Sequence, residues 1–442
     1  MRDAHGCGGD LMSEATKPLP LAGIRVADFS WFGAGPIAGQ TLASFGAEVI
    51  RVESEAHLDG LRTTQPVPPG KEGPNVSGYY NNFNAQKLSF TLNLGHLKAR
   101  EVALRLIACS DIFLENYTPR VVEKWGLTYE DVVRVKPDII YVQMPMQGST
   151  GPHRDFLGFG AIIAPVAGYS YLTGWPDRPP VGLGTNYPDY VINPGHAVVA
   201  ILAALRYRNR TGKGQRIELA QLESVAATLG PFILDYTVNR RVPERQANRS
   251  DIACPHGAFR CKDGPPATPP ASRASLPTAV SGQGEDRWIA IAVYTDAQWE
   301  GLVDAMGRPA WACEERFHTF LGRKRHEDEL EGRIEEWTRT LEAEEVMRLL
   351  QAKGVPAGVV QTARDVLEHD EHLRARGYYQ YLDHPETGRS AYDGPGFRLS
   401  DVPYGLRAPA PLLGQHNDYV LRKVLGYSDE EIAQLVMEQV VF

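Results

Sequence analysis

The sequence predicts an α/β fold whose main domain is a doubly wound parallel sheet. Residues 24–52 contain a β-rich run, a glycine-containing turn, a helical run and a second β-rich run, which together make one βαβ unit. The alternation returns as a helix near residues 97–108 before the strand DIFLEN, and as a helix near residues 129–135 before the strand DIIYVQM. Such alternation is typical of a parallel sheet with helices on both faces.

The second half of the chain changes character. Helical periodicity covers residues 194–207, and after the strand RIELA one long apolar helix is predicted over residues 222–238. The strand RWIAIAV, several charged helices and the strand VPAGVVQ then indicate a smaller α+β domain. We expect a disordered lead-in at residues 1–20, a large domain at 21–225, a linker helix at 226–250 and a small domain at 251–394.

A segment rich in proline, alanine and serine interrupts the predicted small domain at residues 263–283. This composition favours an extended loop rather than a packed element. An exposed insertion and a lid over a site both remain open from composition alone.

Composition excludes several classes of protein. A chain of 442 residues with 43% hydrophobic residues is long enough for two cores, and a formal net charge of −8 does not suit a nucleic-acid partner. The first twenty residues have no apolar core of signal-peptide length, and no later apolar run is long enough to span a membrane. We therefore expect a globular protein without a nucleic-acid or membrane partner.

The five cysteines are scattered and odd in number, which fits a reducing compartment, so we expect a cytoplasmic location. Cys254, His256 and Cys261 in CPHGAFRC supply only three metal ligands, with unusual spacing and no second pair further on. The expectation is therefore that no metal is bound.

The first βαβ unit has some features of a dinucleotide site, because a helix N-terminus attracts phosphate and Glu53 ends the second strand. However, Gly33, Gly35 and Gly39 do not have the GxGxxG spacing, and Pro36 removes one backbone donor. A structural turn and a nucleotide site remain equally open from these residues.

Asp189 lies in the segment TNYPDYVINPGH, in a proline-containing turn before a small, apolar helix. The residues alone favour a structural role, in which the carboxylate caps the helix or stabilises the turn. The alternative uses the same geometry, because a carboxylate near a helix N-terminus stays ionised and can attack an activated acyl group.

Ten segments, spread in order from about residue 21 to residue 441, resemble the class III CoA-transferase family. That family includes formyl-CoA transferase, carnitine CoA-transferase and α-methylacyl-CoA racemase. The segments include LAGIRVADFS, GAGPIAGQTLASFGAEVIRVE, NAQKLSFTLNL, DIFLENYTP, YPDY, ILAALRYRNRTGKGQRIELAQLES, KGVPAGVV and APAPLLGQHND. The resemblance implies a Rossmann-like large domain, a small α+β domain, an interlocked homodimer and a return of residues 395–442 to the large domain.

The resemblance also implies a reaction. The family's catalytic aspartate lies just before the helix that reads ILAAL here, and Asp189 occupies that place. The implied enzyme is an acyl-CoA:carboxylate CoA-transferase that works through an aspartyl mixed anhydride and an aspartyl-CoA thioester. The CoA thioester enters as a substrate, with succinyl-CoA as the expected donor, and no permanently bound cofactor is expected.

The CoA pocket implied by the resemblance maps onto matching strings in this chain. Lys87 stands for a lysine that contacts phosphate, and Lys124 stands where relatives often carry arginine, next to an Arg120 that replaces a usual glycine. The expected CoA-contacting residues are Phe32, Gly33, Ala34, Lys87, Asn116, Tyr117 and Lys124.

Alternatives to transfer remain. A racemase pairs the aspartate with a histidine thirty residues upstream, because inversion at a carbon atom needs two opposed acid–base groups. Phe159 stands at that position, so transfer is favoured. An NAD-binding oxidoreductase that uses Glu53 and a non-catalytic CoA-binding protein are the other hypotheses.

Overall fold

A computed structural model describes residues 19–184, 186–264 and 286–442 of the chain. The lead-in up to residue 18 and nearly all of the predicted insertion at 263–283 lie outside these residues. The chain divides into two compact units. Unit 1 contains residues 19–169, 182–239 and 374–442, and unit 2 contains residues 170–181 and 240–373.

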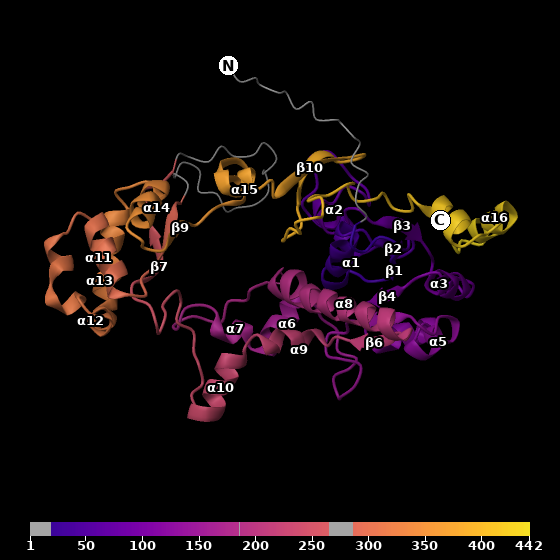
Figure 1. Ribbon diagram of the computed structural model, residues 1–442, viewed down its shortest axis with the longest axis horizontal. Coiled ribbons are helices and arrows are strands. Elements are labelled where there is room, and N and C mark those ends of the chain that lie inside the picture. Colours follow the sequence, from indigo (N-terminus) through magenta and orange to yellow (C-terminus); the bar gives the residue numbers. More distant parts are fainter. Residues whose placement is uncertain (1–18, 185, 265–285) are drawn as a thin grey trace, which may run out of the picture. The chain divides into compact units, whose positions relative to one another are not determined.

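Unit 1 is built on a six-stranded sheet in the order β3-β2-β1-β4-β5-β6 (Figure 1). All five pairings are parallel, so the predicted parallel α/β sheet is confirmed. Its order is that of a Rossmann fold, in which the chain turns back at the centre of the sheet. The strands are β1 (Arg25–Asp28), β2 (Glu48–Glu53), β3 (Leu88–Thr91), β4 (Ile112–Glu115), β5 (Ile140–Gln143) and β6 (Gln215–Glu218).

Each face of this sheet has its own apolar core. On one face, α1 (Ala34–Ser44) and α8 (Asn193–Thr211) pack against β1, β4 and β5. On the other face, α3 (Ala99–Ala108) and α5 (Tyr129–Val135) pack together with residues near the C-terminus. Burial on both faces explains why the central strands have continuous apolar runs.

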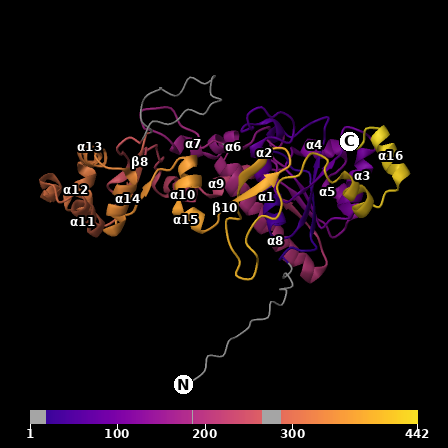
Figure 2. The same cartoon turned by 90° about the horizontal axis from the view of Figure 1, so that it is seen from above.

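The C-terminal residues belong to the second of these cores. The π-helical turn η6 (Tyr419–Val424) and α16 (Asp429–Met437) contribute Val420, Leu421 and Leu435 to it. Figures 1 and 2 both show α16 beside α3, and Lys98 at the start of α3 forms an ion pair with Glu438. The last segment of the chain is therefore part of the large unit.

One element differs from the sequence prediction. The helix expected over residues 222–238 is two helices, α9 (Gln221–Ala227) and α10 (Gly230–Asn239). Pro231 has no N–H to donate to a carbonyl group in the preceding turn, and glycine at position 230 lowers helix stability further. The break at this Gly-Pro pair explains the difference.

The remaining elements of unit 1 are short. Strands β10 and β11, which lie within the range expected for the small domain, form an antiparallel ribbon in unit 1. The short elements of unit 1 are η1 (Gly60–Thr63), α2 (Gly78–Phe83), α4 (Pro119–Trp125), α6 (Gly160–Ala167), η2 (Pro188–Ile192), β10 (Tyr379–His384) and β11 (Gly388–Asp393).

Unit 2 has a three-stranded antiparallel sheet in the order β7-β8-β9. Helices cover one face of it around buried Phe259, Ile291 and Trp299. The elements are β7 (His256–Arg260), β8 (Trp288–Ala292), α11 (Asp296–Ala305), α12 (Phe320–Arg325), α13 (Glu327–Thr338), α14 (Ala343–Ala352) and β9 (Ala357–Val359). Two short helices, α7 (Tyr169–Leu172) and α15 (Glu371–Ala375), contain the points in the sequence at which one unit ends and the other begins.

None of the helices in the described ranges has the length and apolar character to cross a membrane.

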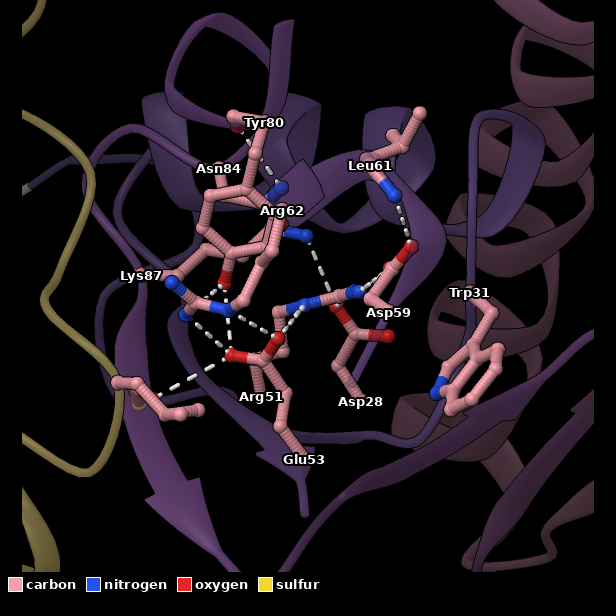
Figure 3. A network of polar contacts seen from close by, with 12 residues as sticks. Asp28, Trp31, Arg51, Glu53, Asp59, Leu61, Arg62, Tyr80, Asn84 and Lys87 are labelled. Atoms are coloured by element: carbon pink, nitrogen blue, oxygen red, sulfur yellow. Dashed lines mark hydrogen bonds and ion pairs between the residues drawn. The ribbon is translucent and has the colours of Figure 1, made fainter. Parts of the chain in front are cut away.

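A buried network of charged side chains connects β1, β2 and β3 (Figure 3). Its members are at most 3% exposed: Asp28, Arg51, Glu53, Asp59, Arg62 and Lys87. Lys87 Nζ lies 2.8 Å from Asp28 Oδ2, and Arg62 donates to both oxygens of Glu53 at 2.8 and 2.7 Å. Arg51 contacts Asp59. Three acidic and three basic groups therefore neutralise one another inside the protein.

The ionisation of this network follows from its geometry. Burial by itself would raise the pKa of Glu53, but the Arg62 and Arg51 guanidinium groups outweigh it and lower the pKa to about 2. Tyr80 donates a hydrogen bond of 2.7 Å to the same carboxylate, and the Arg62 guanidinium lies over its ring. Glu53 is thus held by structural partners and is not available to a ribose.

Removing one partner of this network should destabilise unit 1. We expect Lys87→Met to lower the free energy of unfolding by about 3 kcal/mol, because Asp28 then keeps the Ser30 N–H and a 3.8 Å contact to Arg51 but loses its close cationic partner. The matched control Lys98→Met, at an exposed pair, should cost less than about 1 kcal/mol. Urea unfolding measures both values, and equal losses would contradict the structural role of the network.

Candidate active site

The candidate cavity lies between β1 and β4, at the point where the order of the strands in the sheet reverses. The connections from β1 and β4 leave in opposite directions, and ligands bind outside the carboxyl ends of the strands at such a point. A cavity of about 340 Å³ opens there, entirely within unit 1. Its walls are residues 31–34 after β1, residues 116–118 and 121 after β4, Met146, residues 156–159, Asp189 and Gln221.

Hydrogen bonds tie the two turns of this cavity together. The Trp31 N–H donates to Asn116 Oδ1 at 2.7 Å, and Asn116 Nδ2 donates back to the Trp31 carbonyl at 2.7 Å. The Trp31 ring stacks on His57 at 5.2 Å. Gly33 then precedes α1, whose first-turn N–H groups have no partner within the helix. A helix N-terminus of this kind favours negative charge at the cavity wall.

Asp189 reaches this cavity from the π-helical turn η2 that leads into α8. Its side chain is buried, and Oδ2 accepts a 2.8 Å hydrogen bond from the N–H of Gly160, the first residue of α6. Neither η2 nor α8 has a side-chain cap, so the carboxylate does not cap its own helix. Its position at the start of α6 stabilises the ionised form.

Aromatic rings surround this carboxylate. Phe159, just before Gly160, stacks almost parallel to Phe32 at 6.0 Å with an angle of 9° between the rings. Tyr79 lies nearby, and both its burial and the negative charge of Asp189 raise the pKa of its hydroxyl. The site therefore has one buried carboxylate in a largely apolar wall, whose Phe32 and Phe159 rings are partly exposed.

Gly33 allows the first turn to approach Asp189 closely. A Cβ atom at position 33 would lie 2.7 Å from Tyr190 Cε1 and 3.1 Å from Asp189 Cβ. Because the first distance is shorter than carbon atoms tolerate, any side chain here would force the Tyr190 ring, and with it the packing beside Asp189, to shift.

The cavity brings together six of the eight site residues expected from the sequence. Phe32, Gly33, Ala34, Asn116, Tyr117 and Asp189 line it. Lys87 does not, since it is buried against Asp28, and burial lowers the pKa of its ammonium group to about 8. Lys124 is exposed in the last turn of α4, outside the lining. The ligand contacts assigned to these eight residues stay predictions.

Sequence reasoning missed Gln221, a buried polar residue of the cavity wall. Its Nε2 donates to the Met144 carbonyl at 2.6 Å, and its Oε1 accepts from Asn193 Nδ2 at 3.1 Å. These bonds join the start of α9 to β5 and to the first turn of α8. Gln221 lies in the family-like segment that ends in IELAQLES, but that segment does not reveal its contacts, because its partners are 28 and 77 residues away.

Glu115 was also missed, although its place at the end of the predicted strand DIFLEN is a signal for a site residue. It is buried, and its Oε2 accepts a 2.8 Å hydrogen bond from the N–H of Tyr117 in the cavity wall. Burial raises the pKa of Glu115 to about 8, against the opposing effects of that N–H and of Arg216. A protonated carboxyl group therefore supports the turn after β4.

Glu115 should make stability depend on pH. A carboxyl whose pKa is raised on folding contributes stability that is fully present below its ordinary pKa and is lost as pH rises through about 8. Glu115→Gln keeps an acceptor for Tyr117 but does not titrate. We expect the difference in unfolding free energy between variant and wild type to grow in favour of the variant by about 1 kcal/mol or more from pH 5.5 to 7.5. Urea unfolding at both pH values measures it, and a constant difference would contradict the assignment.

Together, the fold and the site define a Rossmann-like α/β protein with a carboxylate in its ligand crevice. Comparison with known families gives a match to the model of CoA-transferase family III over residues 21–417. The chain belongs to CoA-transferase family III. The predicted resemblance and the prediction of a CoA-transferase are thus confirmed.

Individual relatives cover almost the whole chain. The succinyl-CoA–L-malate CoA-transferase beta subunit of Chloroflexus aurantiacus is 33% identical, over 97% of this chain and 100% of its own length. The formyl-CoA:oxalate CoA-transferase of Rhodopseudomonas palustris is 31% identical, over 94% of this chain and 96% of its own.

Solved structures have the same fold. A CAIB/BAIF family protein from Brucella suis superposes with a TM-score of 0.78 at 29% identity, covering 92% of this chain and 100% of that one. The protein Rv3272 of M. tuberculosis gives 0.72 at 26% identity, covering 90% of this chain and 98% of that one.

Proposed function

We propose that the chain transfers CoA from an acyl-CoA to a free carboxylic acid, with Asp189 as the covalent nucleophile. The observation that carries this proposal is the buried Asp189 carboxylate, held by the Gly160 N–H in a cavity that the N-terminus of α1 also faces. Because several relatives are named for succinyl-CoA, we propose succinyl-CoA as donor and a small dicarboxylic acid as acceptor.

The proposed reaction has two symmetrical halves. An Asp189 oxygen attacks the thioester carbonyl, the C–S bond breaks, and CoA leaves as a thiolate while a mixed anhydride forms. The thiolate then attacks the aspartyl carbonyl and expels the donor acid as its carboxylate, which leaves an aspartyl-CoA thioester. The acceptor carboxylate attacks this thioester, and the released thiolate attacks the acceptor carbonyl of the new anhydride, which regenerates Asp189.

Each attack places negative charge on a carbonyl oxygen, so backbone donors must lie close to Asp189. We propose that the N–H groups of Ala34 and Gly35 at the start of α1, together with the N–H of Gly160, act as these donors. Asp189 itself is buried, which limits the access of water that would otherwise hydrolyse the anhydride.

A racemase is the alternative within the family, and the residue beside Asp189 argues against it. Inversion at a carbon atom needs a second acid–base group opposite the first. Phe159 occupies the relevant position with a ring that cannot titrate, and the cavity wall contains no histidine in the described ranges. A racemase would exchange a proton of 2-methylacyl-CoA in heavy water without an acceptor acid, and we expect no exchange.

The direct test replaces the nucleophile. Asp189→Asn retains an acceptor for the Gly160 N–H but should reduce transfer from succinyl-CoA to malate or citramalate by about 1,000-fold or more, because the covalent path is lost. Thioester products are measured by mass spectrometry, and Asp177→Asn, at an exposed aspartate, is the matched control. Transfer at the wild-type rate by a folded Asp189→Asn variant would overturn the proposal.

We also propose that the protein acts as a homodimer, as the family resemblance implies, in the cytoplasm, as the scattered cysteines suggest. Helix α10 supports the dimer, because none of its residues is buried. Phe232, Ile233, Leu234 and Val238 are large apolar residues on it, between 43% and 75% exposed. An apolar helix of this kind is typical of a surface that a second chain covers.

The dimer makes a measurable prediction. Light scattering of the purified protein should give twice the chain mass of 48.8 kDa. Leu234→Asp should shift the mass toward the monomer because it places a charge on the apolar helix, whereas Leu321→Asp, at an equally exposed leucine of α12, should not. A monomeric wild-type protein would contradict the dimer.

A further inference from the structure

Phe32, in the cavity wall, has an unusual backbone conformation. Its φ angle is 57°, in the left-handed region that non-glycine residues rarely adopt because the Cβ atom then crowds the following carbonyl oxygen. Such a conformation persists only when the surrounding structure holds it. The residue that holds Phe32 therefore determines the shape of the turn that approaches Asp189.

Asp59 is that residue. Its Oδ2 accepts a 3.2 Å hydrogen bond from the Phe32 N–H, and its Oδ1 accepts a 2.9 Å hydrogen bond from the N–H of Leu61. The Arg51 guanidinium contacts the same carboxylate, which is fully buried (Figure 3). With both oxygens engaged, the carboxylate is fixed in one orientation.

The neighbouring residue also fixes the ring of Phe32. A Cβ atom at Gly60 would lie 2.9 Å from Phe32 Cε1 and 3.0 Å from its Cζ, so the ring packs directly on the Gly60 backbone. The two-residue segment Asp59–Gly60 thus contacts both the main chain and the side chain of Phe32.

Phe32 and Gly33 then contact the surroundings of Asp189 on two sides. The ring of Phe32 stacks on Phe159, and the next residue, Gly160, donates the hydrogen bond to the Asp189 carboxylate. Gly33 packs against the Asp189 side chain itself. A shift of the turn would therefore change both the packing and the hydrogen bonding of the nucleophile.

We propose that Asp59 is a positioning residue for the reaction, which holds the Phe32–Gly33 turn against Asp189. It acts through the turn and touches no substrate, and the buried charge network keeps it in place. This inference rests on the function proposed for Asp189. It adds a role for a residue that lies outside the cavity wall.

The test compares two variants that each change one buried carboxylate of the same network into an amide. Asp59→Asn removes the negative charge of the side chain that contacts the Phe32–Gly33 turn. The asparagine side chain has one oxygen atom, so it cannot accept from the Phe32 and Leu61 N–H groups with separate oxygens. Glu53→Gln is the matched control, since Glu53 bonds to Arg62 and Tyr80 and does not contact the turn. Thermal unfolding of both variants measures the structural cost.

Two readouts separate positioning from stability. Hydrogen–deuterium exchange of the peptide that contains Phe32 and Gly33 should be faster in Asp59→Asn and unchanged in Glu53→Gln. In assays with succinyl-CoA and an acceptor acid, kcat should fall about 10- to 100-fold in Asp59→Asn, with a larger share of succinyl-CoA hydrolysed rather than transferred. KM for succinyl-CoA should change much less.

Equal rates of hydrogen–deuterium exchange and an equal loss of kcat in Asp59→Asn and Glu53→Gln would overturn the positioning role of Asp59. If Asp59→Asn does not fold, Gly60→Ala provides the second test. The added methyl group displaces the Phe32 ring while the charge network stays complete. An unchanged kcat in Gly60→Ala would refute the proposal. If wild type transfers no CoA, the function proposed for Asp189 fails, and the exchange comparison alone still decides whether Asp59 holds the turn.

Discussion

The arrangement of unit 1 depends on the charge pairing between the carboxyl ends of β1 and β2, the residue that precedes β3, and the segment around η1. Six ionisable side chains are buried there, and the cost of burying a charge is several kcal/mol unless a partner of opposite sign lies against it. Three acids and three bases satisfy this condition with short contacts between Lys87 and Asp28, between Arg62 and Glu53, and between Arg51 and Asp59. Such a set fixes the relative positions of the strands and loops that carry it.

The same pairing determines the geometry of the cavity. Asp28 ends β1 and accepts the N–H of Ser30, and Asp59 accepts the N–H of Phe32. The chain between β1 and α1 is therefore held at two points by carboxylates whose own positions are set by ion pairs. Because Gly33 follows directly, this loop approaches Asp189 without a side chain in between. The nucleophile proposed here thus depends on charges that are not part of the cavity wall.

Much of the fold could be predicted from the sequence. Strands buried on both faces are continuous apolar runs, and the helix predicted at residues 129–135 coincides with α5. The long helix predicted over residues 222–238 was wrong because the apolar periodicity continues across the Gly-Pro pair that separates α9 from α10.

The site was predictable only in part. The residues around Asp189 favoured a helix cap, and the family resemblance alone indicated a nucleophile. Lys87 shows why contacts are harder to predict, since a lone lysine in a sequence does not reveal a buried aspartate 59 residues away. The pairing of Phe32 with Asp59 and the contacts of Gln221 likewise depend on the folded chain, because their partners come from separate elements.

The central claim is that Asp189 forms covalent intermediates during transfer, first a mixed anhydride with the acyl group and then a thioester with CoA. Its most direct test is to incubate the protein with succinyl-CoA, stop the reaction with hydroxylamine during turnover, and measure the mass of the peptide that contains Asp189. Hydroxylamine converts an aspartyl anhydride or thioester into a hydroxamate, so a gain of about 15 Da on Asp189 that requires succinyl-CoA is the predicted result. An unmodified Asp189 peptide in a preparation that is transferring CoA would contradict the account.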